Sequence, residues 1–211
     1  MLTVCETFKS IQGESTLAGE VCAFVRLAGC NLSCVYCDSR YARTGGTSMS
    51  VDDVCAWVRS QECRLVEITG GEPLLQKETA ILAGRLCDDG HTVLVETNGS
   101  KDISMLPEPC IRILDVKSPA SGAGGSLHMP NLNELRPHDE CKFVLCDRAD
   151  FEWAVDFVAQ YRLAGRCTII FSPAWNILAP KDLAAWMLEK NTVARLGLQV
   201  HKFIWGDARG R

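Results

Sequence analysis

Apolar, β-rich runs that alternate with helical patterns constrain this chain more than any other feature of its sequence. Several of these runs are almost continuously apolar, as expected for strands that are covered on both faces. They lie at residues 21–28, 65–69, 92–97, 111–116, 141–146, 168–171 and 198–204. Because strand–helix–strand alternation requires parallel pairing with right-handed crossovers, the sequence predicts an α/β sheet or barrel.

Helical patterns fill the intervals between these runs. Ser50 and Asp53 form a capping-box variant that predicts a helix to about Ser60. Further helices are predicted at residues 77–86 and 151–163 and from Pro180, with Ile81 and Val193 on their apolar faces. No repeat and no linker divides the chain, so residues 1–211 are predicted to form a single domain.

Composition and charge exclude several classes of protein. The chain is 47% hydrophobic, so it is too apolar for a disordered protein, and its net charge of −4 offers no basic surface for nucleic acid. No apolar run approaches the length of a membrane span, and no secretory signal is visible. Twelve cysteines are too few for a disulfide scaffold of this size. We therefore expect a cytoplasmic protein whose thiols are mostly buried.

Three of the cysteines form a cluster directly after the first strong strand. Cys30, Cys34 and Cys37 have the spacing C-x3-C-x2-C. They can be ordinary loop thiols, or structural zinc ligands that need a fourth partner such as Cys5, Cys22 or a histidine. Alternatively they hold a cubic iron–sulfur cluster, in which three thiolates leave one iron free to bind a small molecule.

A Gly-Gly-Glu-Pro turn at residues 70–73 ends the second strand. By itself it is an ordinary strand-to-helix turn, although glycines also let a backbone approach a ligand closely. The turn and the cysteine cluster both follow strands, where α/β folds place their ligands. Together they resemble the radical S-adenosylmethionine (SAM) superfamily. The resemblance implies that the open iron chelates the methionine part of SAM, whose reductive cleavage yields a 5′-deoxyadenosyl radical.

Further motifs sharpen the resemblance. Residues 6–14, 96–99, 115–119, 142–144 and 198–202, taken in order, resemble the 7-carboxy-7-deazaguanine synthase family along almost the whole chain. That family converts 6-carboxy-5,6,7,8-tetrahydropterin to 7-carboxy-7-deazaguanine with loss of ammonia, on the route to queuosine and related 7-deazapurines. The implied fold is an incomplete TIM-like barrel of six to seven mostly parallel strands. One departure is Ser15, where we expect glycine.

The resemblance implies three cofactors: a [4Fe-4S] cluster on the three cysteines, SAM, and Mg²⁺. The Mg²⁺ ligand is expected at Ser39, which on sequence alone also suits a helix cap. Glu96 and Asn98 are weaker candidates for SAM binding, and the two Ser-Pro pairs can equally be simple strand ends. The other SAM-binding candidates are Tyr36, Cys37, Asp38, Gly71, Ser118, Pro119, Ser172 and Pro173.

The expected substrate contacts follow from the chemistry of a pterin, which carries N–H donors along its pyrimidine edge and a carboxylate on its reduced ring. Oxygens of residues 11–14 can accept from the donors, and Arg26 can grip the carboxylate unless it forms a surface ion pair. No histidine stands out as a general base, and His201 is expected in the last strand. The implied contacts are Ile11, Gln12, Gly13, Glu14, Arg26, Thr69 and Arg211.

Two alternatives stay open on the sequence. One is a radical SAM activase that forms a glycyl radical on a partner protein, which shares the cysteine cluster and the Gly-Gly-Glu turn. The other is a non-catalytic module stabilised by zinc. For a synthase, we expect a reducing partner such as a flavodoxin or ferredoxin, and a homodimer that covers the edges of the open barrel.

Overall fold

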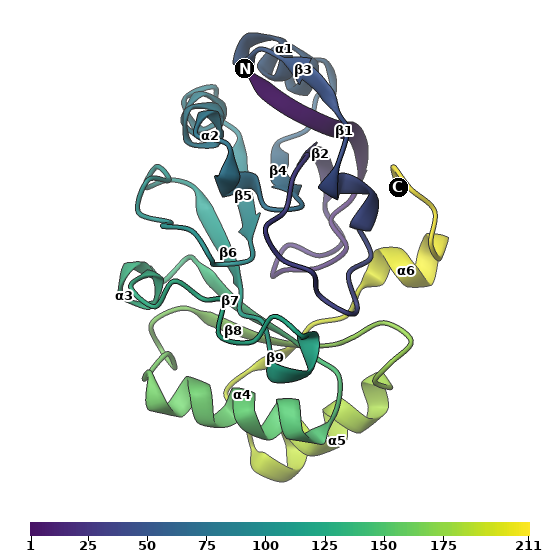
Figure 1. Ribbon diagram of the computed structural model, residues 1–211, viewed down its shortest axis with the longest axis vertical. Helices are drawn as coiled ribbons and strands as arrows, with labels where there is room; N and C mark the ends of the chain where they lie inside the picture. The colour runs from purple at the N-terminus through teal and green to yellow at the C-terminus, as the bar shows by residue number, and fades with distance from the viewer.

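A nine-stranded sheet forms the centre of the computed structural model, which describes residues 1–211 (Figure 1). Its order is β3-β1-β2-β4-β5-β6-β7-β8-β9, and β2 and β4 to β9 run parallel. The sheet curls but does not close, so β3 and β9 remain its outer strands. The strands are β1 (Leu2–Ile11), β2 (Val21–Leu27), β3 (Thr47–Met49), β4 (Leu65–Gly70), β5 (Thr92–Thr97), β6 (Ile111–Asp115), β7 (Glu140–Leu145), β8 (Thr168–Pro173) and β9 (Arg195–Leu196).

Helices cover the outer side of the curled sheet, and α1 packs on α2 as α4 packs on α5 (Figure 1). Ser50 and Asp53 form the expected capping box at the start of the first helix. The α-helices are α1 (Val51–Ser60), α2 (Glu78–Asp88), α3 (Asn131–Glu134), α4 (Arg148–Gln160), α5 (Pro180–Lys190) and α6 (Val200–Trp205). Short 3-10 turns are η1 (Arg40–Arg43), η2 (Pro73–Leu75) and η3 (Pro119–Ser121).

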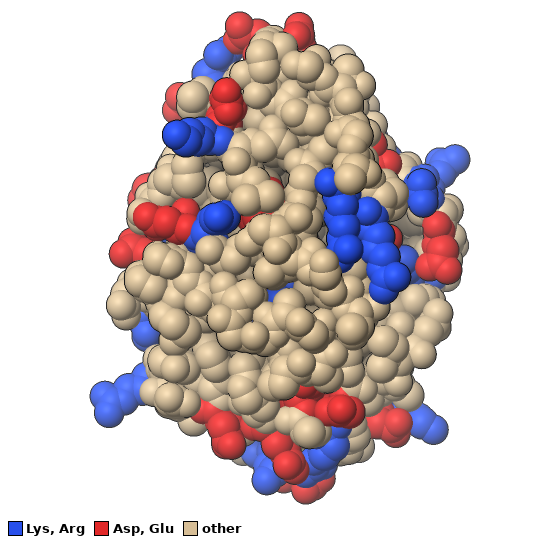
Figure 2. Space-filling view, in the orientation of Figure 1, with Lys and Arg blue, Asp and Glu red and all other residues tan.

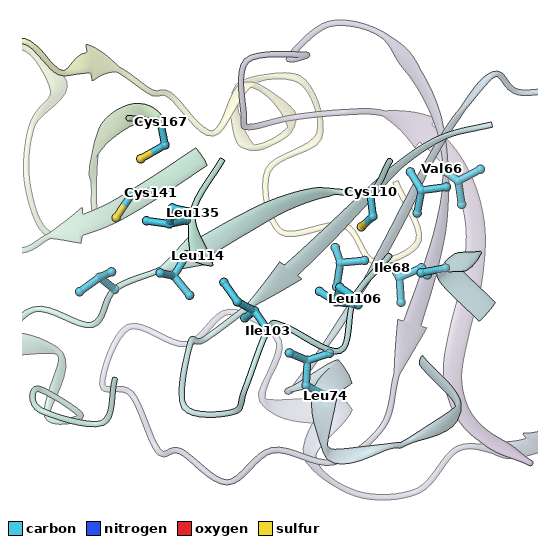
Figure 3. Packing of buried hydrophobic residues seen from close by; sticks show 14 of the residues in the cluster. Val66, Ile68, Leu74, Ile103, Leu106, Cys110, Leu114, Leu135, Cys141 and Cys167 are labelled. Carbon is cyan, nitrogen blue, oxygen red and sulfur yellow. The ribbon is translucent and has the colours of Figure 1, made fainter. Parts of the chain in front are cut away.

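The two faces of the sheet bury different kinds of side chain. A core of 36 buried residues lies between the sheet and the helices. Three of its members, Cys110, Cys141 and Cys167, lie among aliphatic side chains as small apolar residues (Figure 3). All twelve thiols are free. The inner face holds a smaller apolar cluster of Cys22, Phe24, Leu65, Leu94 and Ile113, which fills the lower part of the lumen.

The predicted fold class, an incomplete α/β barrel of mostly parallel strands, is confirmed, and six of the seven predicted strands occur where expected. The seventh prediction is wrong, because residues 200–205 form α6. A short apolar run without flanking turn residues is compatible with both a strand and a helix, so its tertiary contacts determine which of the two forms. Two other details also differ from expectation: Ile81 and Val193 are 58% and 68% exposed.

The antiparallel strand β1 was not predicted, and the loop that joins it to β2 enters the lumen. Gln12 N donates to Glu20 O and Gly19 N to Gln12 O, which closes the base of this loop. Its tip reaches β7, where Thr16 N donates to Glu140 Oε1 over 2.9 Å. Ser15 has a φ of 58°, which explains the glycine expected there, because a side chain in this region is strained.

Acidic and basic side chains are mixed around the rim of the face in Figure 2, and a pair of basic side chains lies right of its otherwise mostly uncharged centre. No helix is both long enough and apolar enough to span a membrane.

Candidate active site

A cavity of about 270 Å³ opens at the carboxyl ends of the parallel strands. The β1–β2 loop, the loop after β2 and the C-terminal segment complete its wall. The structure therefore brings together most of the residues singled out from the sequence. Those that line the cavity are Ile11, Gln12, Gly13, Glu14, Arg26, Cys30, Cys34, Tyr36, Cys37, Asp38, Ser39, Thr69, Gly71, Glu96, Asn98 and Arg211.

The three cysteines of the loop after β2 face this cavity from separate positions. No three cysteine, histidine or acidic side chains in the structure converge on one ion. A single tetrahedral zinc ion needs its ligands gathered around one point, whereas a cubic cluster takes each thiolate on a different iron. The cavity-lining triplet of Cys30, Cys34 and Cys37 therefore fits the cluster better than zinc.

The glycine turn after β4 packs directly on the cysteine loop. Gly71 N donates to Leu27 O over 3.2 Å, and Glu72 N donates to Gly29 O over 2.7 Å. A Cβ at Gly71 would lie 2.3 Å from Gly29 O and 2.7 Å from Cys30 Cβ. The absence of a side chain is thus required by the approach of two backbones, in addition to any approach of a ligand.

Glu72 fastens the same turn to the end of β5. Its Oε1 accepts from Leu74 N (2.9 Å) and from Thr97 Oγ1 (2.7 Å), and its Oε2 accepts from Asn98 N (2.7 Å). Burial raises the pKa of Glu72 despite these hydrogen bonds. This carboxyl group is fully buried, so its role is to hold two strand ends together.

A ring of charged side chains lies directly above the apolar cluster of the lumen. Each member stands two residues after an inward-facing residue of its strand, so the alternation of the strands places it on the same face. The members, which we call the lumenal ring, are Arg26 of β2, Glu67 of β4, Glu96 of β5, Asp115 of β6 and Lys142 of β7.

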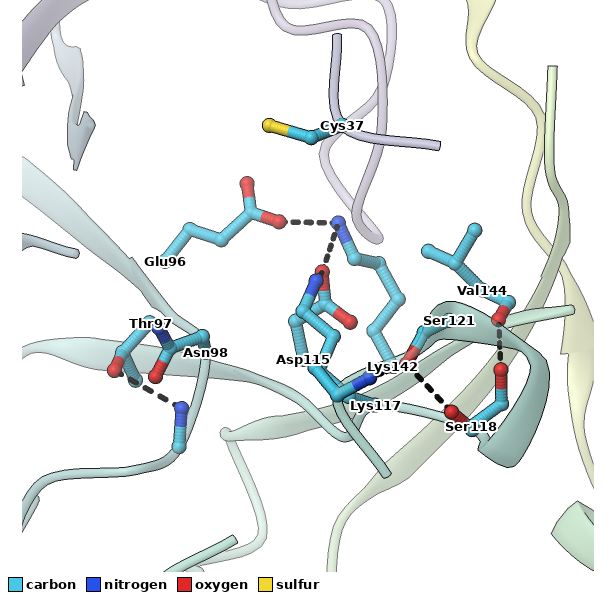
Figure 4. A network of polar contacts seen from close by, with 12 residues as sticks. Cys37, Glu96, Thr97, Asn98, Asp115, Lys117, Ser118, Ser121, Lys142 and Val144 are labelled. Carbon is cyan, nitrogen blue, oxygen red and sulfur yellow. Dashed lines mark hydrogen bonds and ion pairs between the residues drawn. The ribbon is translucent and has the colours of Figure 1, made fainter. Parts of the chain in front are cut away.

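Lys142 is the central cation of the lumenal ring. Its ammonium group pairs with Glu14 at 2.7 Å. It also pairs with Glu96 and lies 3.8 Å from Asp115 (Figure 4). Although burial opposes its charge, Glu14 and Glu96 raise the pKa of Lys142 well above its ordinary value. The ammonium group is therefore charged, and the ion pairs hold the β1–β2 loop, β5 and β7 together.

Glu14 of the β1–β2 loop and Glu67 of β4 have pKa values that are shifted in opposite directions. Burial acts to raise the pKa of Glu14, but Lys142 and His201 outweigh it and lower that pKa to about 2. For Glu67, burial and the charges of Glu96 and Glu14 raise the pKa well above its ordinary value. The only hydrogen bond of the Glu67 side chain comes from Gln12 Nε2 to its Oε2.

Arg26 and Ser39 lie near the cysteine loop, with free polar groups. Arg26 Nε donates to Glu6 Oε1 over 2.8 Å, whereas its two Nη groups make no hydrogen bond within the chain. This is a partly buried ion pair, and it leaves the Nη groups for a ligand.

Ser39 precedes η1, but its side chain makes no capping bond and lies 3.9 Å from Cys37 Sγ.

Both Ser-Pro pairs lie outside the cavity wall. Ser118 Oγ donates to Asp150 Oδ2 over 2.8 Å and contacts Val144 O, so it joins η3 to β7 and α4 (Figure 4). Ser172 and Pro173 end β8. Neighbouring residues line the cavity in their place, namely Lys117, Ala174 and Trp175.

The C-terminal segment forms part of the cavity wall through α6. Val200 N donates to Gly13 O over 2.8 Å, and Gln199 Nε2 donates to Glu14 Oε1 over 2.9 Å. His201 was predicted in a strand, but it lies in the helix α6. Its side chain lines the cavity. A Cβ at Gly13 would lie 2.0 Å from His201 Nδ1, which explains the glycine at that position.

Comparison with known sequences identifies the class to which this site belongs. The profile described as the Radical SAM superfamily matches residues 25–172, which include the cysteine loop, the glycine turn and the whole lumenal ring. The chain is therefore a member of the Radical SAM superfamily.

Full-length relatives define the family within it. The chain is 46% identical to the 7-carboxy-7-deazaguanine synthase of Koribacter versatilis, with 97% of both chains covered. It is 44% identical to that of Chlorobaculum tepidum, covering 99% of this chain and 97% of the relative. It belongs to the 7-carboxy-7-deazaguanine synthase family.

A solved structure is similar in fold. The crystal structure of QueE from Escherichia coli covers 95% of this chain and 94% of its own, with a TM-score of 0.80 and 22% identity. This likeness confirms the open barrel across almost the whole chain.

Adding one methyl group at Gly71 should distort the cysteine loop and reduce its capacity to bind iron. We expect Gly71→Ala to reduce the iron bound after anaerobic reconstitution to roughly half or less, because the new Cβ displaces the backbone that carries Cys30. Iron per chain is the measurement. Gly84→Ala is the control, since no atom lies within 4 Å of its added Cβ in α2. Full iron loading of Gly71→Ala would contradict this prediction.

Proposed function

We propose that this chain is a 7-carboxy-7-deazaguanine synthase, which converts 6-carboxy-5,6,7,8-tetrahydropterin to 7-carboxy-7-deazaguanine and ammonia. The observation that carries the proposal is the 46% identity to a relative of that name over 97% of each chain. The residues through which the sequence resembles that family also gather around one cavity. Neither a glycyl-radical activase nor a zinc module accounts for both observations.

The residues of the cavity divide into a cofactor side and a substrate side. On the cofactor side, we assign the cluster to Cys30, Cys34 and Cys37, and SAM to Tyr36, Asp38 and Gly71, which lie beside it. Membership of the superfamily implies both groups. When bound and reduced, they supply the radical that removes a hydrogen atom from the substrate.

On the substrate side, the protein binds and orients the pterin. The free Nη groups of Arg26 suit the carboxylate, and Thr69 stands opposite Arg26 in the register of β2 and β4. Backbone and side-chain oxygens of residues 11–14 suit the N–H donors of the pyrimidine edge. The C-terminal segment, which includes Arg211, forms part of the cavity wall and so limits the entry of water.

Mg²⁺ binding at Ser39 is part of the proposal. The ion is hard and retains several water ligands, so one protein hydroxyl beside a substrate carboxylate suits it. Ser39 lines the cavity and its side chain is not used as a helix cap, which leaves the hydroxyl group available. Polarisation of the carboxylate would then accompany its binding to Arg26.

We also propose a cytoplasmic homodimer that is reduced by a flavodoxin or ferredoxin. Twelve free thiols suit a reducing compartment. The outer strand β9 and exposed apolar side chains offer a surface for a second copy. These side chains are Leu188, Val193, Leu196, Phe203 and Ile204. Sedimentation velocity at micromolar concentration should show a dimer, and a monomer would contradict this assignment.

The decisive test of the proposed reaction is product formation. Reconstituted protein with SAM, Mg²⁺ and a reductant should convert carboxytetrahydropterin to 7-carboxy-7-deazaguanine, as detected by mass spectrometry. Replacement of Cys30, Cys34 and Cys37 by alanine should abolish both iron binding and product. SAM cleavage by the unaltered protein without this product would contradict the proposed substrate.

Loss of the Ser39 hydroxyl should weaken the response to Mg²⁺. We expect Ser39→Ala to raise the Mg²⁺ concentration for half-maximal turnover by about tenfold, because one ligand of the ion is removed. Ser33→Ala is the matched control, since Ser33 belongs to the same loop but does not line the cavity. An unchanged Mg²⁺ response in Ser39→Ala would remove the assignment.

A further inference from the structure

Glu67 is the carboxyl group of the lumenal ring that has no cationic partner. Glu96 and Asp115 each pair with a lysine, as does Glu14 of the adjoining loop. The Glu67 side chain accepts one hydrogen bond, from Gln12 Nε2 to Oε2, and its Oε1 accepts none within the chain. The residue is 3% exposed and lines the cavity. The unpartnered Oε1 is therefore free to accept a hydrogen bond from a ligand in the cavity.

The position of Glu67 fits one end of a bicyclic ligand. Thr69 stands opposite Arg26, and Glu67 lies one inward-facing position deeper along β4. Two residues of a strand span about 7 Å. A pterin carries its 6-carboxylate and its pyrimidine edge at opposite ends of the fused rings. With the carboxylate at Arg26, the pyrimidine edge therefore extends toward the level of Glu67 and Gln12.

The charges around Glu67 favour a ligand edge that donates hydrogen bonds. The charged groups that act on Glu67 are the carboxyl groups of Glu14 and Glu96 and the cations of Lys142 and Arg26, so with Glu67 itself the carboxyl groups outnumber the cations here. The 2-amino group and N3–H of a pterin are two adjacent donors. An ionised carboxyl group can accept from both at once, so binding of this edge favours the charged form of Glu67, which burial and the neighbouring carboxyl groups disfavour in the free cavity.

We propose that Glu67 is a specificity-determining residue that selects the 2-amino-pyrimidine edge of the substrate, with Gln12 fixing the orientation of its carboxyl group. This inference rests on the proposed function and deepens it, because it names the part of the substrate that Glu67 recognises. A ligand with a 2-oxo group would place an acceptor against the carboxyl oxygen and bind weakly.

The test compares binding of two ligands that differ at one position, 6-carboxypterin and 6-carboxylumazine, in which oxygen replaces the 2-amino group. Calorimetry on the reconstituted protein with SAM should show that the unaltered chain prefers the pterin by about 10- to 100-fold. In Glu67→Gln, an amide N–H group faces the ligand donors. This variant should bind the pterin about tenfold or more weakly and lose most of the preference.

Glu152→Gln is the control, because Glu152 lies on the surface of α4 and does not line the cavity. It should retain the preference of the unaltered chain. Equal affinity of the unaltered chain for both ligands would overturn the role of Glu67, even if Glu67→Gln failed to fold. The role of Glu67 would also be overturned if Glu67→Gln preferred 6-carboxypterin as strongly as the unaltered chain does. Failure of the proposed function is distinct, since it appears as absence of product in the unaltered protein.

Discussion

The close approach of two backbone segments underlies the whole active site. The turn that begins at Gly70 lies on the loop after β2, and a Cβ at Gly70 would lie 2.2 Å from Leu27 O. Two amide groups of the turn donate to carbonyl groups of Leu27, the last residue of β2, and of Gly29 in that loop. Because β2 and β4 are adjacent parallel strands, this contact places the cysteine loop and the turn at one edge of the sheet. Any side chain at these glycines would separate them.

Below that contact, the inward-facing side chains of β2, β4, β5 and β6 change from apolar to charged over two residues of each strand. Phe24 and Leu65 belong to the apolar cluster, and Arg26 and Glu67 follow them two residues later. The apolar layer excludes water from beneath the charges, so the ion pairs of Lys142 act in a medium of low polarity where they are strong. The barrel can therefore remain open at its edges and still hold its polar groups rigidly.

The sequence predicts the parallel strands and the positions of the cysteine loop and glycine turn, because these depend on local patterns and short spacings. It did not reveal the role of Glu67 or Lys142, although each interrupts an otherwise apolar strand, which is a usable signal for a charged group in a lumen. The strand β1 was missed because its pattern, residues 2–11, mixes polar and apolar residues without regular alternation. The helix α6 was misassigned because its position depends on packing against Gly13, a contact between the two ends of the chain.

The contacts that form the substrate side join distant parts of the polypeptide. Glu14 is 128 positions from Lys142 and 185 positions from Gln199. Such contacts are entropically costly to form, so they arise late in folding and open early in partial unfolding. The strands can therefore persist in a state whose binding pocket has already come apart. Loss of ligand binding would then precede the cooperative melting of the barrel.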